Sequence, residues 1–305
     1  MKETRDIIVH HSISDLYKAL NLPIKQETDF TIHFLPDIHP TVPFTSPVFR
    51  ANYYSFVFVK DGRGTYTTDE QVFATAPGTI YFTNPGHIKA FELKELNDAY
   101  IITLTEAFLK EQVHPAIFEE FPFLLAETVP PSTLPPGEFV EFEKLYLQIF
   151  EEFKKESPSK YKIIGNLFVV LLLKIKDRSW KNYDPLEEGD RSSQIVKAFK
   201  RSMEKHYRAL NEGVEKYLYQ VQDYAREQNL HPSYLSNVIK SKTGRSVNQW
   251  IREKTIAEAQ ALLKNSSLTA KEVGYKLGFS EPTHFSSYFK KHTGFTPNSY
   301  RKQVT

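Results

Sequence analysis

The stretch that decides the fold occurs twice in the chain. Residues 234–251 read YLSNVIKSKTGRSVNQWI, and residues 284–301 read HFSSYFKKHTGFTPNSYR. At an offset of fifty residues Lys240 meets Lys290, and Thr243-Gly244 meets Thr293-Gly294. Apolar positions repeat along with these identities. Self-similarity at one fixed offset indicates a duplicated supersecondary unit.

Each copy predicts a helix, a short turn and a second helix. Pro232 and Pro282 suit the first turn of a helix, where a missing N–H costs nothing. After Pro232, residues Leu235, Val238 and Ile239 fall at the i, i+3, i+4 spacing of one apolar stripe. In the second copy, Gly278 suits a helix C-terminus and Ser280 is predicted to cap the next helix. This pattern is typical of a helix-turn-helix, whose second helix enters the major groove of DNA.

The region as a whole resembles a known family. The two quoted stretches, the segment TIAEAQALLKNSS at 255–267 and the segment LTAKEVGYKLGF at 268–279 resemble the DNA-binding domain of AraC/XylS bacterial transcription regulators. The resemblance implies two helix-turn-helix units joined by a long helix over 247–264, with recognition helices about one DNA turn apart. It implies double-stranded promoter DNA as a partner, with RNA polymerase as a further one.

Carried over by position, the resemblance also implies which residues face DNA. They are Ser233, Tyr234, Ser236 and Asn237 in the first unit and Pro282, Thr283, Ser286 and Ser287 in the second. Arg reads guanine and Asn reads adenine, and here Asn237 and Ser287 stand where the family often has Arg. Specificity is therefore expected to depend on Asn237 and on DNA shape. The residues expected to hold the phosphate backbone are Lys240, Lys242, Arg245, Lys290 and Lys291.

Charge is divided unevenly along the chain. Residues 205–305 hold sixteen Lys or Arg against eight Asp or Glu, whereas residues 1–204 hold twenty-three against twenty-nine. The lysines of residues 205–305 could form a merely solvated face. The net charge is +8 for residues 205–305 and −6 for residues 1–204. This division favours instead a DNA-binding domain attached to a sensing domain.

Length and composition bound the number of domains and exclude several classes of protein and site. A chain of 305 residues has room for two domains, and 40% hydrophobic residues suffice for packed cores. With no Cys, disulfides, thiolate metal sites and cysteine nucleophiles are excluded. Residues 1–11 show no secretory signal, and the apolar run Leu167–Leu173 is too short to span a bilayer. We expect a cytoplasmic protein without a membrane partner.

Residues 30–104 predict a β domain. Strands are expected at 54–59, 65–68, 71–74, 79–82, 89–93 and 99–104, with a turn at Asp61–Gly64 and others at Pro77-Gly78 and Asn84–Gly86. The segment resembles the cupin-like barrel or jelly roll that many AraC-type regulators carry as a sensor. The predicted fold is α+β and multidomain, with a sensor at 1–130, a helical dimerisation and linker segment at 131–195 and the DNA-binding domain at 196–305.

Aromatic side chains of the β domain are candidates for a small-molecule effector site. The candidates are Tyr53, Phe56, Tyr66, Tyr81 and His87. Strand alternation would bury many of these rings in any β domain, so a plain core is the alternative. His33, His39 and His87 are too scattered for the metal cluster of a catalytic cupin. No catalytic residue, metal or cofactor is predicted, although a cupin-type enzyme and a ligand-independent regulator stay as alternatives.

Two amphipathic segments follow the β domain. Residues 138–153 and 160–178 predict helices, and the second is apolar around most of its circumference. They could form an intramolecular pair packed on the barrel, an interface between two copies of the chain, or both, and we favour a homodimer. A polar stretch at 181–193 is predicted to be a hinge.

Overall fold

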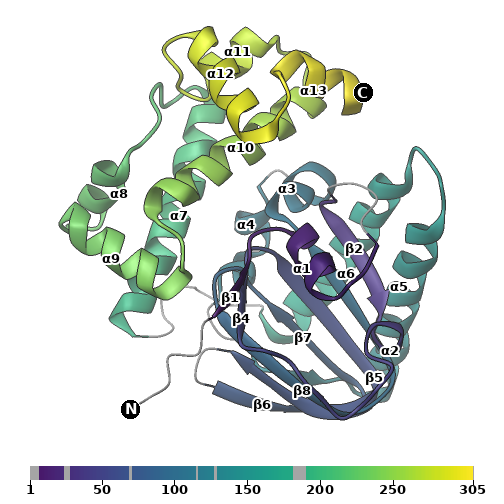
Figure 1. The fold of residues 1–305 in the computed structure, drawn as a ribbon. Helices are drawn as coiled ribbons and strands as arrows, with labels where there is room; N and C mark the ends of the chain where they lie inside the picture. The colour runs from purple at the N-terminus through teal and green to yellow at the C-terminus, as the bar shows by residue number, and fades with distance from the viewer. Residues whose placement is uncertain are drawn as a thin grey trace. The chain divides into compact units, whose positions relative to one another are not determined.

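The chain folds into two compact units. The structure is a computed structural model that describes residues 7–23, 28–68, 71–114, 116–126, 129–180 and 190–304. The first unit comprises residues 1–108 and 126–182, and the second comprises residues 109–125 and 183–305. Figure 1 shows a β-rich body and an all-helical body. The expected α+β multidomain fold is confirmed, while most of the predicted hinge, at 181–189, lies outside the described residues.

One nine-stranded sheet forms the first unit. Its path runs β1 (Ile8–His10), β4 (Phe49–Ala51), β8 (Ile88–Leu104), β5 (Tyr54–Thr68), β7 (Thr79–Thr83) and β9 (Ser132–Thr133). β2 (Phe30–Phe34) and β3 (Phe44–Thr45) also pair with β8, and β6 (Gln71–Thr75) pairs with β5. Short helices α1 (Ile13–Ala19), α2 (Leu35–Ile38) and α3 (Glu106–Phe108) lie between or after the strands. The long antiparallel pair β5 and β8 is the framework of the unit.

The predicted turn at Asp61–Gly64 is wrong, because β5 runs through it without a break. The register between β5 and β8 shifts at Val59/Asp61, Asp61/Gly62 and Arg63/Gly64, so these residues form bulges rather than a hairpin. Bulges bend a strand and increase its twist. At Gly64 a Cβ atom would lie 2.1 Å from the Glu92 carbonyl oxygen, which explains why glycine stands at this bend. The strands expected at 89–93 and 99–104 are likewise one strand, β8.

Helices α5 (Pro136–Lys154) and α6 (Lys160–Ser179) belong to the same unit as the sheet. Phe56 meets Phe168 of α6 edge-on at a ring distance of 4.9 Å, and Phe58 lies 5.2 Å from the Tyr146 ring of α5. The face of the sheet that carries Phe56 and Phe58 is therefore buried under the two helices. α5 and α6 thus share a core with the strands, as an intramolecular pair packed on the sheet.

The regular structure of the second unit, in its described residues, is helical. It contains α7 (Arg191–Glu212), α8 (Val221–Glu227), α9 (Pro232–Thr243), α10 (Val247–Asn265), α11 (Ala270–Lys276), α12 (Pro282–Thr293) and α13 (Pro297–Val304). It also contains η1 (Leu109–Val113), α4 (Ile117–Glu120) and η2 (Pro122–Leu125), which come from the middle of the chain. Fully buried Phe199, Tyr207 and Tyr224 anchor its core. Within the described residues of the chain, no helix is both long and apolar enough to cross a membrane.

A buried histidine in this core predicts an acid-sensitive fold. His206 Nε2 accepts a hydrogen bond from the Tyr219 backbone N–H at 3.1 Å, and its ring stacks on Tyr219 at 3.8 Å. Burial lowers the pKa of His206 to about 4. The folded state then binds fewer protons than the unfolded state between pH 6.5 and 4, so stability present above pH 6.5 is lost as the pH falls toward 4.

Urea unfolding followed by circular dichroism from pH 7 to 4 checks this expectation. Replacing His206 by Gln keeps an acceptor for the Tyr219 N–H and should flatten the decline over that range. An equally steep decline in His206→Gln would assign the acid sensitivity to other groups.

Candidate nucleic-acid interface

The first helix-turn-helix consists of α8 and α9. Between them the chain turns at Asn229, whose φ of 54° lies in the left-handed region that Asn tolerates well. α9 begins at Pro232 as predicted, and the His231 ring caps it by accepting a hydrogen bond from the Ser233 N–H at 3.3 Å. Leu235 and Ile239 are fully buried against the core. The opposite side of α9 is therefore free to meet a partner.

The second helix-turn-helix, which consists of α11 and α12, has the same form. Gly278 makes the turn with a φ of 81°, and α12 begins at Pro282. The predicted cap at Ser280 is wrong: Glu281 is the N-cap residue, without a side-chain cap hydrogen bond. A Cβ at Gly274 would lie 2.9 Å from Phe285 Cβ, so glycine here lets α11 approach α12 closely.

The two helix-turn-helix motifs differ by one residue in the length of the turn. The first helices align at an offset of forty-nine, Ala225 with Gly274 and Asn229 with Gly278, whereas the second helices align at fifty. The additional residue lies between Phe279 and Pro282. The turn accommodates it, so both recognition helices present corresponding positions to solvent.

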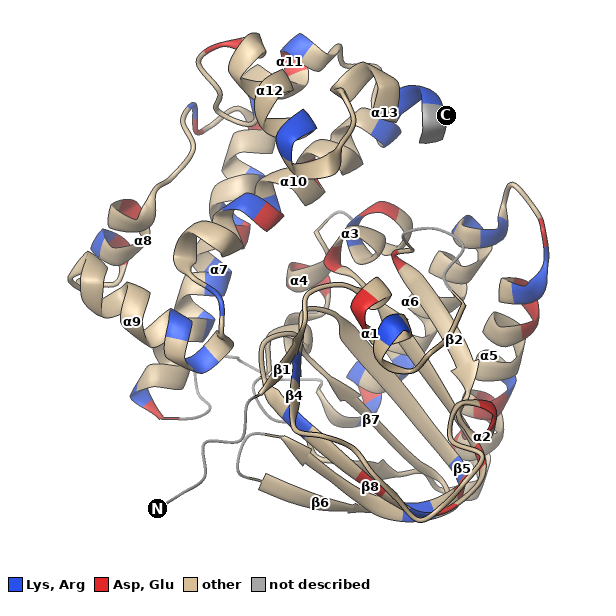
Figure 2. Cartoon of the chain, viewed as in Figure 1, with Lys and Arg blue, Asp and Glu red and all other residues tan. Residues whose placement is uncertain are grey.

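Most of the residues predicted to contact DNA lie on these exposed faces. On α9, Ser233, Tyr234, Asn237 and Lys240 are exposed, and Ser236 is half-buried. On α12, Thr283, Ser287, Lys290 and Lys291 are exposed, and Pro282 and Ser286 are half-buried. Basic residues gather in the last turns of both helices (Figure 2). The structure thus brings together a small polar surface flanked by positive charge on each recognition helix.

Lys242 and Arg245 are placed differently. Lys242 Nζ lies 3.3 Å from Asp190 Oδ2 at the start of α7. Hydrogen bonds from Ser193, and then the Lys242 ammonium, lower the pKa of Asp190 to about 2. The Arg245 guanidinium is buried, pairs with Glu253 at 2.6 Å and lies 4.3 Å from the Trp250 ring centre. This placement argues against the phosphate contact expected of Arg245 and indicates that it stabilises the start of α10.

His284 is a candidate that the sequence reasoning missed. It is exposed on the first turn of α12, with Nε2 3.8 Å from Glu281 Oε2. The fifty-residue offset pairs it with Tyr234, which is itself 46% exposed. Applying that offset to every predicted contact, rather than only to identical residues, would have found it.

An inner cavity of about 200 Å³ lies between the sheet of the first unit and helices α1 and α2. Three of the predicted effector residues, Tyr53, Tyr66 and Tyr81, line it, together with the buried Lys89. Lys89 Nζ donates to Thr83 Oγ1 at 2.7 Å. Among the described residues, the buried Tyr53 hydroxyl has no hydrogen-bond partner. The cavity therefore offers an ammonium group and an unused hydroxyl inside largely apolar walls.

Histidines contribute to the same walls without forming a metal cluster. Burial lowers the pKa values of His10, His33 and His39, which line this cavity. His33 Nε2 lies 2.7 Å from the Tyr17 hydroxyl. Nowhere in the described portion of the chain do three or more His, Asp or Glu side chains form a group that could hold a metal ion.

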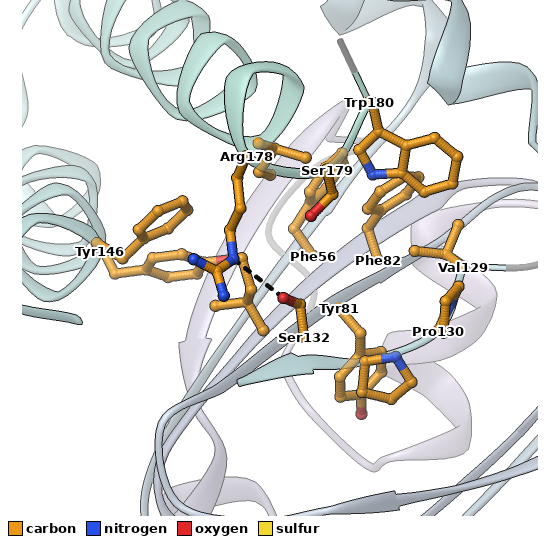
Figure 3. Close-up of a pocket in the computed structure, with 14 residues that line it drawn as sticks. Phe56, Tyr81, Phe82, Val129, Pro130, Ser132, Tyr146, Arg178, Ser179 and Trp180 are labelled. Atoms are coloured by element: carbon orange, nitrogen blue, oxygen red, sulfur yellow. Dashed lines mark hydrogen bonds between the residues drawn. The ribbon is translucent and has the colours of Figure 1, made fainter. Parts of the chain in front are cut away.

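A second cavity, of about 290 Å³, lies between the sheet and helices α5 and α6 (Figure 3). Phe56 belongs to this outer cavity rather than to the inner one, and Tyr81 lines both. Arg178 Nε donates to Ser132 Oγ at 3.0 Å and Nη2 to the Thr133 carbonyl at 2.7 Å, so the guanidinium braces β9. His87 is buried in the turn before β8, apart from the described residues that line either cavity.

Comparisons with known proteins agree with this arrangement. A helix-turn-helix domain family model matches residues 224–303. The transcriptional activator RhaR of Mannheimia succiniciproducens is 23% identical, over 92% of this chain and 94% of its own length. The arabinose operon regulatory protein of Escherichia coli is 24% identical, over 79% of this chain and 77% of its own length.

Among solved structures, the C-terminal domain of AraT, a response regulator from Geobacillus stearothermophilus, is 28% identical. It covers 37% of this chain and 88% of its own length, with a TM-score of 0.33. The relatives are transcription regulators and not enzymes. The helix-turn-helix match and the relatives that align with most of the chain show that the chain is similar to DNA-binding transcription regulators of the AraC type.

Proposed function

We propose that the chain reads promoter DNA by placing α9 and α12 in successive major-groove segments. The observation that carries this proposal is the repeated exposed face, on which small polar residues are flanked by lysines in both helices. Asn237 is suited to adenine, and Ser287 to a base edge or a phosphate. Lys240, Lys290 and Lys291 are suited to the phosphate backbone, which positions the helices without reading sequence.

Capture of sheared genomic DNA on the purified full-length protein, followed by sequencing, tests the proposal. The expected result is enrichment of a few promoter segments that share paired half-sites about one helical turn apart. Uniform retention that disappears with modest salt would show only non-specific electrostatic binding. That outcome would contradict sequence-specific reading by the two helices.

The inner cavity supports a small-molecule effector as the controlling signal. Its walls are mainly apolar, and Tyr53 and Lys89 place a hydroxyl and an ammonium group in them. Such a combination suits a compact ligand that has an apolar body and a hydrogen-bond-accepting or anionic group. To act as a signal, this ligand must favour one arrangement of the two units over another.

Replacing Tyr53 by Phe separates ligand binding from folding. Because the buried hydroxyl has no partner among the described residues, its removal should leave the melting temperature unchanged or higher. A metabolite that raises the melting temperature of the wild-type protein should raise that of Tyr53→Phe less. A metabolite library without any hit, together with unchanged promoter binding, would instead support a ligand-independent regulator.

The exposed side of α6 supports a homodimer. Ile163, Val170 and Leu173 lie along one face of α6 and are 41%, 41% and 42% exposed, while Phe168, Leu171 and Leu172 are buried against the first unit. A second copy of the chain would cover this apolar face. Sedimentation velocity should show a dimer for the wild-type protein and a shift toward monomer for Val170→Lys. Unchanged association in that variant would exclude this face as the interface.

RNA polymerase and a cytoplasmic location complete the proposal. The relative from Mannheimia succiniciproducens is named a transcriptional activator, and a protein bound at a bacterial promoter acts where the polymerase is. Transcription in vitro from a captured promoter, with and without the protein, measures whether this chain activates or represses.

A further inference from the structure

Residues 109–125 contact the DNA-binding unit although they lie far from it in the sequence. This segment, hereafter the clamp, comprises η1, α4 and η2, and it comes between α3 and the strand β9 that precedes α5. It also lies outside residues 224–303, the range that matches the helix-turn-helix model. Its contacts are therefore not explained by the repeat that makes the two recognition helices.

Buried charges fasten the clamp to two helices. Lys110 Nζ lies 2.5 Å from Glu258 Oε1 of α10 and 3.2 Å from Glu204 Oε2 of α7. Lys254 of α10 pairs with the same two carboxylates, and the side chains of Lys110 and Lys254 are only 2% and 1% exposed. Burial alone would raise the pKa of Glu258, but the two ammonium groups and the Asn211 amide lower it to about 2. Lys110, Lys254, Glu204 and Glu258 thus form one cluster with two charges of each sign.

Two acidic residues of the clamp, Glu111 and Glu119, make further contacts with the helices. Glu111 accepts from Lys264 Nζ at 2.9 Å, near the end of α10, and from the Tyr300 hydroxyl of α13 at 3.5 Å. Glu119 Oε2 lies 2.5 Å from Arg208 Nη1 of α7. The clamp thus contacts α7, α10 and α13.

These three helices connect the two helix-turn-helix motifs of the DNA-binding unit. α7 packs on the first helix-turn-helix, where the Phe199 and Tyr224 rings lie 5.2 Å apart. α13 packs on the second, where the Phe289 and Tyr300 rings lie 5.5 Å apart. α10 joins the two. Buried ionic groups are best attested as devices that select one register between elements.

We propose that the clamp is a positioning element for DNA binding, which holds α7, α10 and α13 together and thereby sets the spacing between α9 and α12. Lys110 and Glu111 are positioning residues that do not touch DNA. The inference rests on the proposed reading of two half-sites, because only paired sites make the spacing of the recognition helices matter.

The test compares full-length wild-type protein with the double variant Lys110→Met/Glu258→Gln, which removes one charge of each sign. Fluorescence anisotropy measures binding to a captured promoter fragment, to the same fragment with one base pair inserted between its half-sites, and to a fragment with one half-site. The wild-type protein should lose affinity about tenfold on insertion, a typical cost of one misplaced contact. The double variant should lose less than about threefold, while its affinity for one half-site stays within about twofold of wild type.

A matched control is available in the first unit. Lys174 and Glu141 form an ion pair between α6 and α5, and Lys174→Met/Glu141→Gln makes the same substitutions there. This control should keep the wild-type spacing dependence. If Lys110→Met/Glu258→Gln does not fold, Glu111→Gln replaces it and should relax the spacing dependence in the same direction.

Retention of the full wild-type spacing dependence in the folded clamp variants would overturn the proposal. Equal loss of affinity for one and two half-sites would also overturn it, since that pattern indicates general destabilisation. A wild-type protein that is indifferent to the inserted base pair would contradict the paired half-sites themselves, and with them the clamp.

Discussion

Replacing Phe285 by Ala is expected to lower the free energy of unfolding of the DNA-binding unit by about 3–5 kcal/mol. Phe285 is fully buried, and its ring lies 5.4 Å from that of Phe279 and 5.9 Å from that of Phe289. The neighbouring backbone at Gly274 has no side chain that could move into the space left behind. Urea unfolding followed by circular dichroism measures the loss, and anisotropy with a captured promoter fragment measures the accompanying loss of binding.

Phe295→Ala is the matched control, because the Phe295 side chain is 41% exposed. It removes the same atoms from a site that water already reaches, so the expected change is well under that of Phe285→Ala. Comparable losses in the two variants would contradict the view that α12 is held by burial of Phe285.

The second large effect concerns DNA recognition. Asn237→Ala should lower the affinity for captured promoter DNA by about 1–3 kcal/mol and relax the preference at one base pair, because Asn reads a base edge. Lys290→Ala should weaken binding to all sequences and reduce the slope of log K against log salt by about 0.9, because Lys290 neutralises a phosphate. Titrations against specific and random DNA at several salt concentrations separate the two results.

Lys174→Ala serves as the control for charge. Lys174 lies on α6 of the first unit and pairs with Glu141, so its removal should alter neither the sequence preference nor the salt slope. If Asn237→Ala and Lys290→Ala reduced specific and random binding equally, the separate roles assigned to these two residues would be wrong.

The helix-turn-helix units were predictable because their signals are local. The i, i+3, i+4 stripes and the helix-starting prolines act within about a dozen residues, and α9 and α12 begin at Pro232 and Pro282 as expected. The same local reasoning was wrong at Asp61–Gly64, where residues typical of a turn form bulges. Turn residues favour a bend in the chain, but the partner strand decides whether that bend is a hairpin or a bulge.

The sequence alone also could not separate basic residues that are exposed to DNA from those that are buried. Lys240 and Lys290 are exposed on recognition helices, whereas Arg245 is buried against Trp250 and Glu253. All three are basic residues within, or directly after, a predicted recognition helix. Only the packing of α9 against the start of α10 shows which of them can meet a phosphate.

The sequence by itself determined the family resemblance, the α+β division and the two recognition helices, because each follows from patterns within short stretches of the chain. Tertiary structure alone decided which aromatic residues line the inner cavity and which face α5 and α6. It also decided that residues 109–125 belong with the DNA-binding unit, since Lys110 meets Glu204 and Glu258 across separations of 94 and 148 residues. Contacts of that kind leave no periodic signal, because they depend on how distant elements pack rather than on the spacing within any one of them.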